Sequence, residues 1–90
     1  MLILATTRQF EKSAKLMKKR GKDLSKLQKV VKTLIEQETL PEKYKDHKLT
    51  GNFRDYRECH IEPDWLLIYR ITRTHLYLAQ TGTHSDLFKK

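Results

Sequence analysis

The spacing of the apolar residues changes once along this chain, near Pro41. Before Pro41, apolar residues recur every three or four positions, as they do in amphipathic helices. After it, short segments alternate in character or are apolar throughout, as strands are. A chain of 90 residues can build only one small core. The pattern therefore predicts a single α+β domain over residues 1–90, with helices packed on one face of a mostly antiparallel sheet.

Two helices are expected in the first part of the chain. Thr7 is the predicted N-cap of the first helix, which ends near Arg20 because Gly21 favours the left-handed backbone that terminates helices. Asp23 is the predicted N-cap of the second helix, which ends near residues 39–41. We expect the two helices to form a hairpin, with apolar faces turned to one side and lysines to the other.

Strands are expected in the rest of the chain and at its start. Residues 65–71 (WLLIYRI) are apolar on both alternating faces, which is typical of a central strand. In a predicted strand at residues 56–61, alternation places Cys59 and Ile61 on one face and His60 on the other, so Cys59 and His60 form no catalytic pair. We expect the helices to cover Cys59 and to leave His60 on the open face. The other predicted strands are residues 2–4 and 75–80.

The chain has a formal net charge of +8, and that charge is unevenly distributed. Residues 8–32 contain ten Lys or Arg against two acidic residues, without matching Glu partners four positions away. Such a surface concentrates phosphate-bearing partners or an acidic protein partner. A solvated helix surface is the alternative. The lysines expected to make electrostatic contacts with RNA are Lys12, Lys15, Lys19 and Lys26.

Cysteine content and hydropathy indicate the compartment. Cys59 is the only cysteine, so no disulfide can form within the chain, which fits a reducing cytosol. The apolar start of the chain is too short for a signal peptide, and no apolar run approaches the roughly 20 residues that span a bilayer. We expect a small soluble cytoplasmic protein with no membrane partner.

Three histidines, His47, His60 and His84, end the short runs KDH, ECH and GTH. Imidazole exchanges protons near neutral pH, and Asp64 can reach back across a tight turn to orient His60. On a basic scaffold this combination predicts acid–base chemistry on RNA, whose 2′-hydroxyl is a built-in nucleophile. Each histidine taken alone also fits an exposed turn or loop residue, and His75 is expected to be structural.

Other side chains are candidates for holding RNA. Trp65 and Phe88 can stack on unpaired bases, and Arg57 can face a phosphate. The alternatives are core filling for Trp65 and a carboxylate partner for Arg57. Glu62 and Asp64 lie near the histidines as possible metal ligands, but no ligand spacing of known geometry is present, so we expect no metal site.

Three blocks of the chain carry a more specific signal: residues 44–51 (YKDHKLTG), 56–69 (YRECHIEPDWLLIY) and 81–88 (TGTHSDLF). Together, in this order and at this spacing, they resemble the YafQ branch of the RelE-like toxins of bacterial type II toxin–antitoxin systems. The predicted helical hairpin matches that family in length and position, so the resemblance covers essentially the whole chain. It implies a RelE-like fold, a helical hairpin packed on a small, twisted, mostly antiparallel sheet.

The resemblance also implies a function. Members of this family are endoribonucleases that cleave mRNA in the A site of the 70S ribosome, without a cofactor and in contact with ribosomal RNA. A neutralising, DinJ-like antitoxin is the implied protein partner, with the toxin a monomer alone and part of a hetero-oligomer with its antitoxin. The functional positions implied are His47, His60, Asp64, His84 and Phe88, with Trp65 beside them.

The expected reaction is metal-independent attack of the RNA 2′-hydroxyl on the adjacent phosphate, which leaves a 2′,3′-cyclic phosphate and a 5′-hydroxyl. His84 is the predicted general acid, and the predicted base is either His60 or His47 acting with Asp64. Arg57 is expected to stabilise the developing charge. Two alternatives remain. A non-catalytic basic RNA- or ribosome-binding module explains the charge equally well, and a metal-dependent nuclease would lose its activity on chelation.

Overall fold

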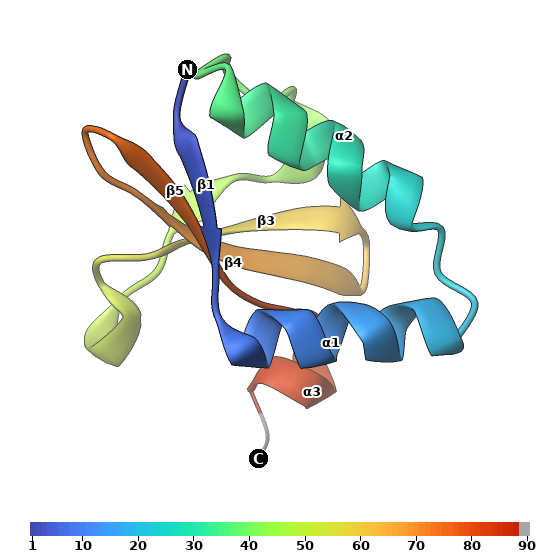
Figure 1. Cartoon of the computed structure of the whole chain (residues 1–90). Coiled ribbons are helices and arrows are strands. Elements are labelled where there is room, and N and C mark those ends of the chain that lie inside the picture. The colour runs from blue at the N-terminus through green and yellow to red at the C-terminus, as the bar shows by residue number, and fades with distance from the viewer. Residues whose placement is uncertain (89–90) are drawn as a thin grey trace.

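The computed structural model describes residues 1–88, with a five-stranded sheet at the centre (Figure 1). The strand order across the sheet is β1-β5-β4-β3-β2; β1 runs parallel to β5, and the other neighbouring strands are antiparallel. The strands are β1 (Ile3–Thr6), β2 (His47–Lys48), β3 (Arg57–Glu62), β4 (Trp65–Ile71) and β5 (His75–Gly82). The predicted central strand is therefore confirmed as β4, which lies in the middle of the sheet.

Two helices, α1 (Arg8–Lys19) and α2 (Leu24–Ile35), lie on one side of the sheet and flank β1 (Figure 1). The α+β fold with an N-terminal helical hairpin is thus confirmed. Two short 3-10 turns, η1 (Glu42–Tyr44) and η2 (Gly51–Phe53), precede β3, and a short helix, α3 (His84–Leu87), follows β5. Within the described residues, no helix is both long and apolar enough to cross a membrane.

The helix ends follow mostly from local chemistry. The Thr7 side chain accepts a hydrogen bond from the Phe10 N–H at the start of α1, and Gly21 after α1 has φ +89°. However, α2 ends at Ile35, so its predicted end at residues 39–41 was wrong by about one turn. The Ile35 carbonyl accepts from the backbone N–H of Leu2 at 2.9 Å, which replaces the bond that would have continued the helix.

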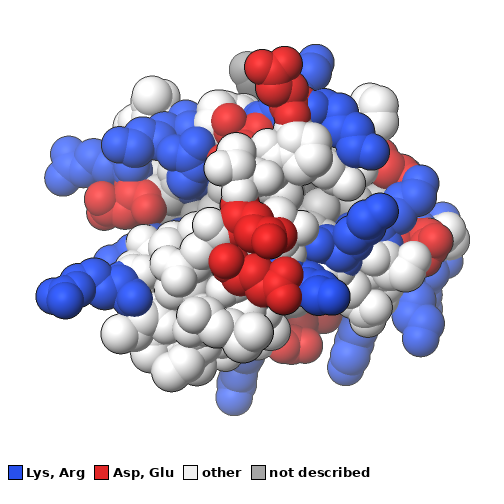
Figure 2. All heavy atoms as spheres, turned by 90° about the horizontal axis from the view of Figure 1, so that it is seen from above, with Lys and Arg blue, Asp and Glu red and all other residues white. Residues whose placement is uncertain are grey.

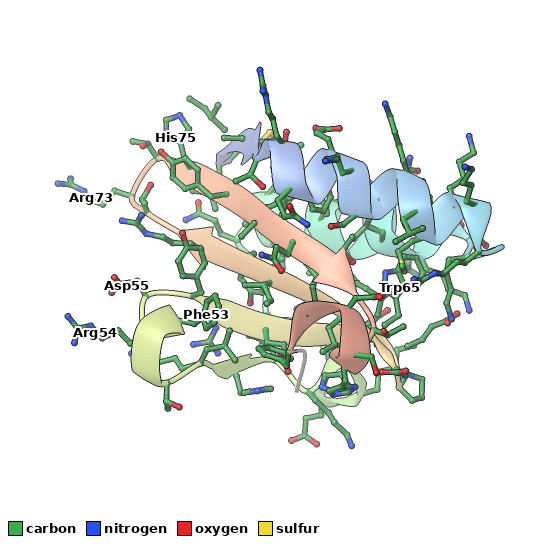
Figure 3. The ribbon with its side chains drawn as sticks, turned by 90° about the horizontal axis from the view of Figure 1, so that it is seen from below. Phe53, Arg54, Asp55, Trp65, Arg73 and His75 are labelled. Carbon is green, nitrogen blue, oxygen red and sulfur yellow. The ribbon has the colours of Figure 1, made fainter. Side chains whose placement is uncertain are left out.

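The core lies between the helices and the sheet. Cys59, Leu67 and Tyr69 face it from β3 and β4, together with Met17 of α1 and Val30 of α2. The neighbouring strand residues must point to the opposite face of the sheet, because successive strand side chains alternate. That second face carries no long helix and is the open face of the sheet (Figure 3).

Candidate active site

Strand register gathers polar residues on the open face. His47 of β2 lies opposite Glu58 of β3, and His60 of β3 lies opposite Leu66 of β4, which in turn lies opposite Gly82 of β5. Directly paired residues of antiparallel strands share a face of the sheet. The chain then turns at Gly82 into α3, whose first residue is His84. One end of the open face therefore receives side chains from β2, β3 and α3.

The three predicted histidines meet there. The ring centroids of His47 and His60 are 6.4 Å apart, and those of His60 and His84 are 5.7 Å apart. His60 is partly buried, with 17% of its side chain exposed, whereas His47 and His84 are about half exposed, at 51% and 55%. His75 lies at the other end of β5, where it stacks on Tyr77. Three of the four histidines thus form one accessible cluster.

Glu58 joins two of these rings. Its carboxylate is buried, with 7% of the side chain exposed, and its Oε1 lies 3.4 Å from Nε2 of His47 and 3.6 Å from Nε2 of His60. A buried carboxylate needs such partners, because burying an unpaired charge is costly. The sequence interpretation did not select Glu58. Strand alternation, which places residues 58 and 60 on the same face, was the available signal.

Backbone carbonyls fix the other nitrogen of each ring. Nδ1 of His47 lies 2.7 Å from the Lys45 carbonyl oxygen, and Nδ1 of His60 lies 3.3 Å from the Pro63 carbonyl oxygen. A carbonyl oxygen only accepts hydrogen bonds, so the hydrogen bonds assign the proton of each neutral ring to Nδ1. In the neutral ring Nε2 then carries the lone pair that can accept a proton, and once protonated this nitrogen can donate to the Glu58 carboxylate beside it.

Asp64 is bound to His84 and not to His60, contrary to the predicted partner. The Asp64 Oδ1 lies 2.6 Å from Nδ1 of His84 and accepts the backbone N–H of His84 at 3.0 Å. These two hydrogen bonds lower the pKa of the Asp64 carboxyl. The turn from β3 to β4 carries Asp64 beyond the last paired residues, to where the chain leaves β5 for α3. This contact also removes the predicted pairing of His47 with Asp64.

The position of His84 depends on how α3 is anchored. Thr83 and Asp86 form a capping box at the start of α3. Asp86 also accepts two hydrogen bonds from Arg20 at the end of α1, at 2.7 and 3.2 Å. The Arg20 guanidinium, followed by the Thr83 backbone N–H, lowers the pKa of Asp86 to about 2. The first helix of the chain thereby holds the short helix that presents His84.

An aromatic pair lies beside the histidines. Phe88 makes an edge-to-face contact with Phe53 of η2, with ring centroids 6.3 Å apart, and Phe53 is 39% exposed. Figure 3 shows this face, with Arg54 and Asp55 directed outward next to Phe53. The predicted stacking role of Phe88 stays a prediction, and Phe53 is a neighbour that the sequence interpretation missed. Phe53 lies in a short polar turn, and such a turn has no helical or strand periodicity from which its contact with Phe88 could be predicted.

Trp65 is not available to stack on a base, so that prediction was wrong. Its side chain is fully buried, and its Nε1–H donates to the Thr81 hydroxyl at 2.9 Å. As the first residue of β4, Trp65 faces the helix side of the sheet, where it belongs to the core cluster. Core filling, the alternative weighed from the sequence, is its role.

Arg57 also lies apart from the histidines. Its Nε and Nη2 donate to Asp46 at 3.3 and 3.1 Å, and the Tyr69 hydroxyl donates to the same carboxylate. Because Arg57 precedes Glu58 in β3, its side chain points to the opposite face of the sheet. The expectation that Arg57 stabilises charge at the reacting phosphate stays a prediction, with the guanidinium bound to Asp46 in this structure. The carboxylate partner left open by the sequence is Asp46, the residue before His47.

The lysines predicted to contact RNA are exposed on the two helices. Lys12, Lys15 and Lys19 project from α1, and their contact with RNA stays a prediction. Lys26 of α2, together with Lys22, binds Glu62 at 2.8 and 2.9 Å. Figure 2 views the molecule from the α2 side, where Lys and Arg side chains project along both margins and carboxylates gather near the middle. On the face seen in Figure 2, the positive charge therefore lies along the margins.

Cys59 and metal ligands complete the inventory of reactive groups. Burial raises the pKa of the Cys59 thiol to about 12, so the thiolate that a nucleophile requires is scarce at neutral pH. Among residues 1–88, no group of three or more His, Cys, Asp or Glu is arranged to hold a metal ion. The chemistry that this site offers is proton transfer by imidazoles oriented by carboxylates and carbonyls.

Comparisons with known proteins agree with this fold. A family model described as the bacterial toxin of type II toxin–antitoxin system, YafQ, matches residues 2–89. The mRNA interferase toxin YafQ of Escherichia coli (strain K12) is 49% identical over 82 residues, which is 89% of this chain and 88% of that protein. The crystal structure of the E. coli DinJ–YafQ toxin–antitoxin complex matches with a TM-score of 0.90 and 43% identity, over 97% of both chains. A metal-bound toxin from Helicobacter pylori matches with a TM-score of 0.92 and 46% identity, over 98% of this chain and 100% of that chain.

The fold of this chain is that of these solved bacterial toxins. Because the family model covers nearly all of its residues, the chain belongs to the YafQ family of toxins of bacterial type II toxin–antitoxin systems. The resemblance inferred from the three sequence blocks is confirmed.

Proposed function

We propose that this chain is a ribosome-dependent, metal-independent endoribonuclease that cuts mRNA in the ribosomal A site in the cytoplasm. The observation that carries the proposal is the cluster of His47, His60 and His84, whose partners Glu58 and Asp64 orient them on the open face of the sheet. RNA cleavage needs only a base, an acid and charge stabilisation, because the substrate supplies its own nucleophile. The relatives named mRNA interferase support the same activity.

The reaction is an in-line transfer at one phosphate. The 2′-oxygen of the ribose forms a bond to phosphorus while the bond from phosphorus to the 5′-oxygen of the next nucleotide breaks. The 2′-hydroxyl proton passes to a base, and an acid gives a proton to the departing 5′-oxygen. The products are a 2′,3′-cyclic phosphate and a 5′-hydroxyl. Each positioned proton transfer contributes about 10²–10⁴-fold to the rate.

His84 is the general acid in this proposal. Asp64 holds the Nδ1–H of His84 at 2.6 Å, so Nε2 is the nitrogen that faces the substrate and delivers the proton. Because hydrogen bonds from His84 lower the pKa of Asp64, the carboxylate stays ionised while the ring is protonated. A carboxylate in this position orients an imidazole and stabilises its charged form, as in hydrolytic triads.

His60 is the base. It is the ring nearest His84, at 5.7 Å between centroids, so one phosphate can contact both rings. Its hydrogen bond to the Pro63 carbonyl assigns the lone pair to Nε2, and Glu58 lies on that side. His47, on the other side of Glu58, adds positive charge when protonated and holds the substrate. Phe88 stacks on a base of the message, with Phe53 supporting its ring.

The ribosome supplies the setting in which the message is cut. Lys12, Lys15 and Lys19 of α1, with Lys26 of α2, contact the phosphates of ribosomal RNA, which orients the histidine cluster toward the A site. Contacts of this kind position a protein without reading sequence. The proposal therefore assigns binding to the helices and chemistry to the open face of the sheet.

The test is cleavage of ribosome-bound message by the purified protein in EDTA, comparing wild type with His84→Ala and with His75→Ala. His75 is the matched control, because it is a histidine outside the cluster. Cleavage by wild type and His75→Ala, reduced at least about 100-fold in His84→Ala, supports the proposal. Equal rates in all three proteins, or RNA binding without any cleavage, would leave a non-catalytic basic binding module.

A metal-dependent reaction is the second candidate, because one structural relative is a metal-bound toxin. Imidazoles are ligands that transition metals select, but among residues 1–88 the three rings of the cluster are not arranged to hold an ion, so binding would require them to move together. Chelation separates the two candidates. If EDTA abolishes cleavage and a divalent cation restores it, the metal-independent mechanism is wrong.

The protein partner in this proposal is a DinJ-like antitoxin, as in the solved E. coli complex, and the free toxin is a monomer. We place an amphipathic antitoxin segment in a groove of about 510 Å³ between α1, α2 and β1. Its lining is mostly apolar, with Leu4, Ala14, Leu24 and Val31 on its surface and the basic helices around it. Ala14→Glu should abolish co-purification with the antitoxin, whereas Ser85→Glu on the exposed side of α3 should not.

A further inference from the structure

A cavity of about 470 Å³ opens next to the histidine cluster, on the side of α2. Lys29 of α2 lines it together with Lys43 and Tyr44 of η1 and with Lys45, which follows η1. The opposite wall is β3 and its turn, and His60 is part of that wall. The cavity and the cluster therefore share a residue, so a ligand that fills the cavity lies next to a reacting group.

The charge in this cavity is strongly positive. Glu62 and Lys26 also line it, but Glu62 is occupied by Lys22 and Lys26, which lower the pKa of its carboxyl. Within residues 1–88, Lys29, Lys43 and Lys45 take part in no ion pair. A concave wall with three such ammonium groups attracts an anion more strongly than a flat surface with the same groups.

The aromatic ring of the cavity is not free for a base. The Lys43 ammonium lies 5.2 Å from the centroid of the Tyr44 ring, so a cation already occupies the vicinity of that ring. Tyr44 also packs against the hydrophobic core. The groups that remain for a ligand are ammonium ions, which suit phosphate oxygens.

We propose that this cavity binds the sugar–phosphate backbone of the message next to the phosphate that is cut. The inference rests on the proposed function, in which the RNA that is cut lies at His60. The cavity volume is in the range of ligand sites that hold one nucleotide-sized group. Lys29, Lys43 and Lys45 contact neighbouring phosphates, one each, and these contacts fix the register of the strand over His60 and His84 without reading its bases.

The experiment measures binding of 2′-O-methyl RNA, which cannot be cleaved, as a dinucleotide and as a hexanucleotide, over a range of salt concentrations. The test variant is Lys29→Gln/Lys43→Gln. The control is Lys18→Gln/Lys32→Gln, which removes the same charge from exposed positions on α1 and α2 outside the cavity. The slope of log K against log salt for the hexanucleotide should fall by about 1.4 in the test variant, because two phosphate contacts on a single strand are lost. The dinucleotide, which reaches only the histidines, should bind all three proteins equally.

Equal hexanucleotide slopes in the test and control variants would overturn the proposal. So would a test variant that loses affinity for 70S ribosomes without message and keeps hexanucleotide binding, because the cavity would then hold ribosomal RNA. The proposed function fails separately. A wild-type protein that cuts no message but shows the hexanucleotide effect is an RNA-binding module whose backbone site is this cavity.

Discussion

The proposed chemistry depends on Glu58, a residue that was not a candidate from the sequence. Its buried carboxylate has imidazole nitrogens 3.4 and 3.6 Å away on two sides, from His47 and His60. An ionised group in this position orients both rings and offsets the charge that develops when His60 takes a proton. The two histidines are therefore expected to act as a coupled unit.

Glu58→Gln should lower the single-turnover rate of message cleavage by at least about 10-fold, because the amide keeps the volume and loses the charge that stabilises protonated His60. The matched control is Glu42→Gln, which changes an exposed carboxylate in η1. This variant should cleave message at the wild-type rate. Thermal unfolding of both variants separates an effect on chemistry from an effect on folding. A Glu58→Gln protein that is folded and fully active would contradict the role.

Trp65 supports the fold from inside the core. Trp65→Phe should destabilise the fold by about 1–3 kcal/mol, because it removes the indole N–H that donates to the buried Thr81 hydroxyl at 2.9 Å. Urea unfolding measures this change. The cleavage rate per folded molecule should be unchanged, since the ring contacts no substrate. Phe88→Leu should have the opposite effects, because it should slow cleavage and change the free energy of unfolding only slightly. A Trp65→Phe protein with normal stability and poor RNA binding would restore the stacking role.

At the scale of elements, α3 is held to α1 by a bond that is sensitive to acid. The folded-state pKa of Asp86 is about 2, below the ordinary value of about 3.9 for an aspartate. A depressed pKa stabilises the folded state above the ordinary value, and this stabilisation is lost as the pH falls from about 4 toward 2. Asp86→Asn lacks this contribution. The difference in free energy of unfolding between wild type and Asp86→Asn should be constant above about pH 5 and shrink between about pH 4 and 2. A difference that persists unchanged to pH 2 would show that the Arg20–Asp86 pair does not anchor α3.

Elements whose signals are local were predictable from the sequence. Thr7 and Asp23 cap the two helices, and β4 spans the residues predicted for the central strand. Alternation also placed Cys59 inward and His60 on the open face. These signals depend on residues only a few positions apart, which is the range over which periodicity and capping act.

Contacts between distant elements were not predictable in the same way. Asp64 was assigned to His60 because the two are close in sequence, yet the β5–α3 connection brings His84 to it. The second helix ends early, at Ile35, where the carbonyl oxygen accepts a hydrogen bond from the backbone N–H of Leu2, just before β1. Both outcomes depend on how strands and helices pack, and a single sequence carries that information only through a family resemblance.

At the scale of the molecule, the sheet separates two tasks. The helices cover one face (Figure 1) and carry the dense run of lysines. The histidine cluster stands on the other face. The core is completed by residues from both layers, so changes to exposed lysines should leave the fold intact. Ribosome binding and chemistry can therefore be perturbed separately.

Lys12→Gln/Lys15→Gln/Lys19→Gln should weaken binding to 70S ribosomes and reduce its salt dependence, because phosphate contacts are lost. Cleavage at saturating ribosome concentration should proceed at the wild-type rate. Sedimentation with ribosomes and single-turnover cleavage provide the two readouts. A loss of the saturated rate with normal binding would place these lysines in the chemistry, contrary to the account.

The chemistry of the cut ends tests the central claim most directly. Message cleaved on the ribosome in EDTA should leave a 2′,3′-cyclic phosphate on the upstream fragment and a 5′-hydroxyl on the downstream fragment, and His84→Ala should produce neither. These ends result when the 2′-oxygen attacks, and their loss in His84→Ala assigns protonation of the 5′-oxygen to that ring. Fragments with a 3′-hydroxyl and a 5′-phosphate would mean that water is the nucleophile, and the histidine acid–base mechanism proposed for this open face would be wrong.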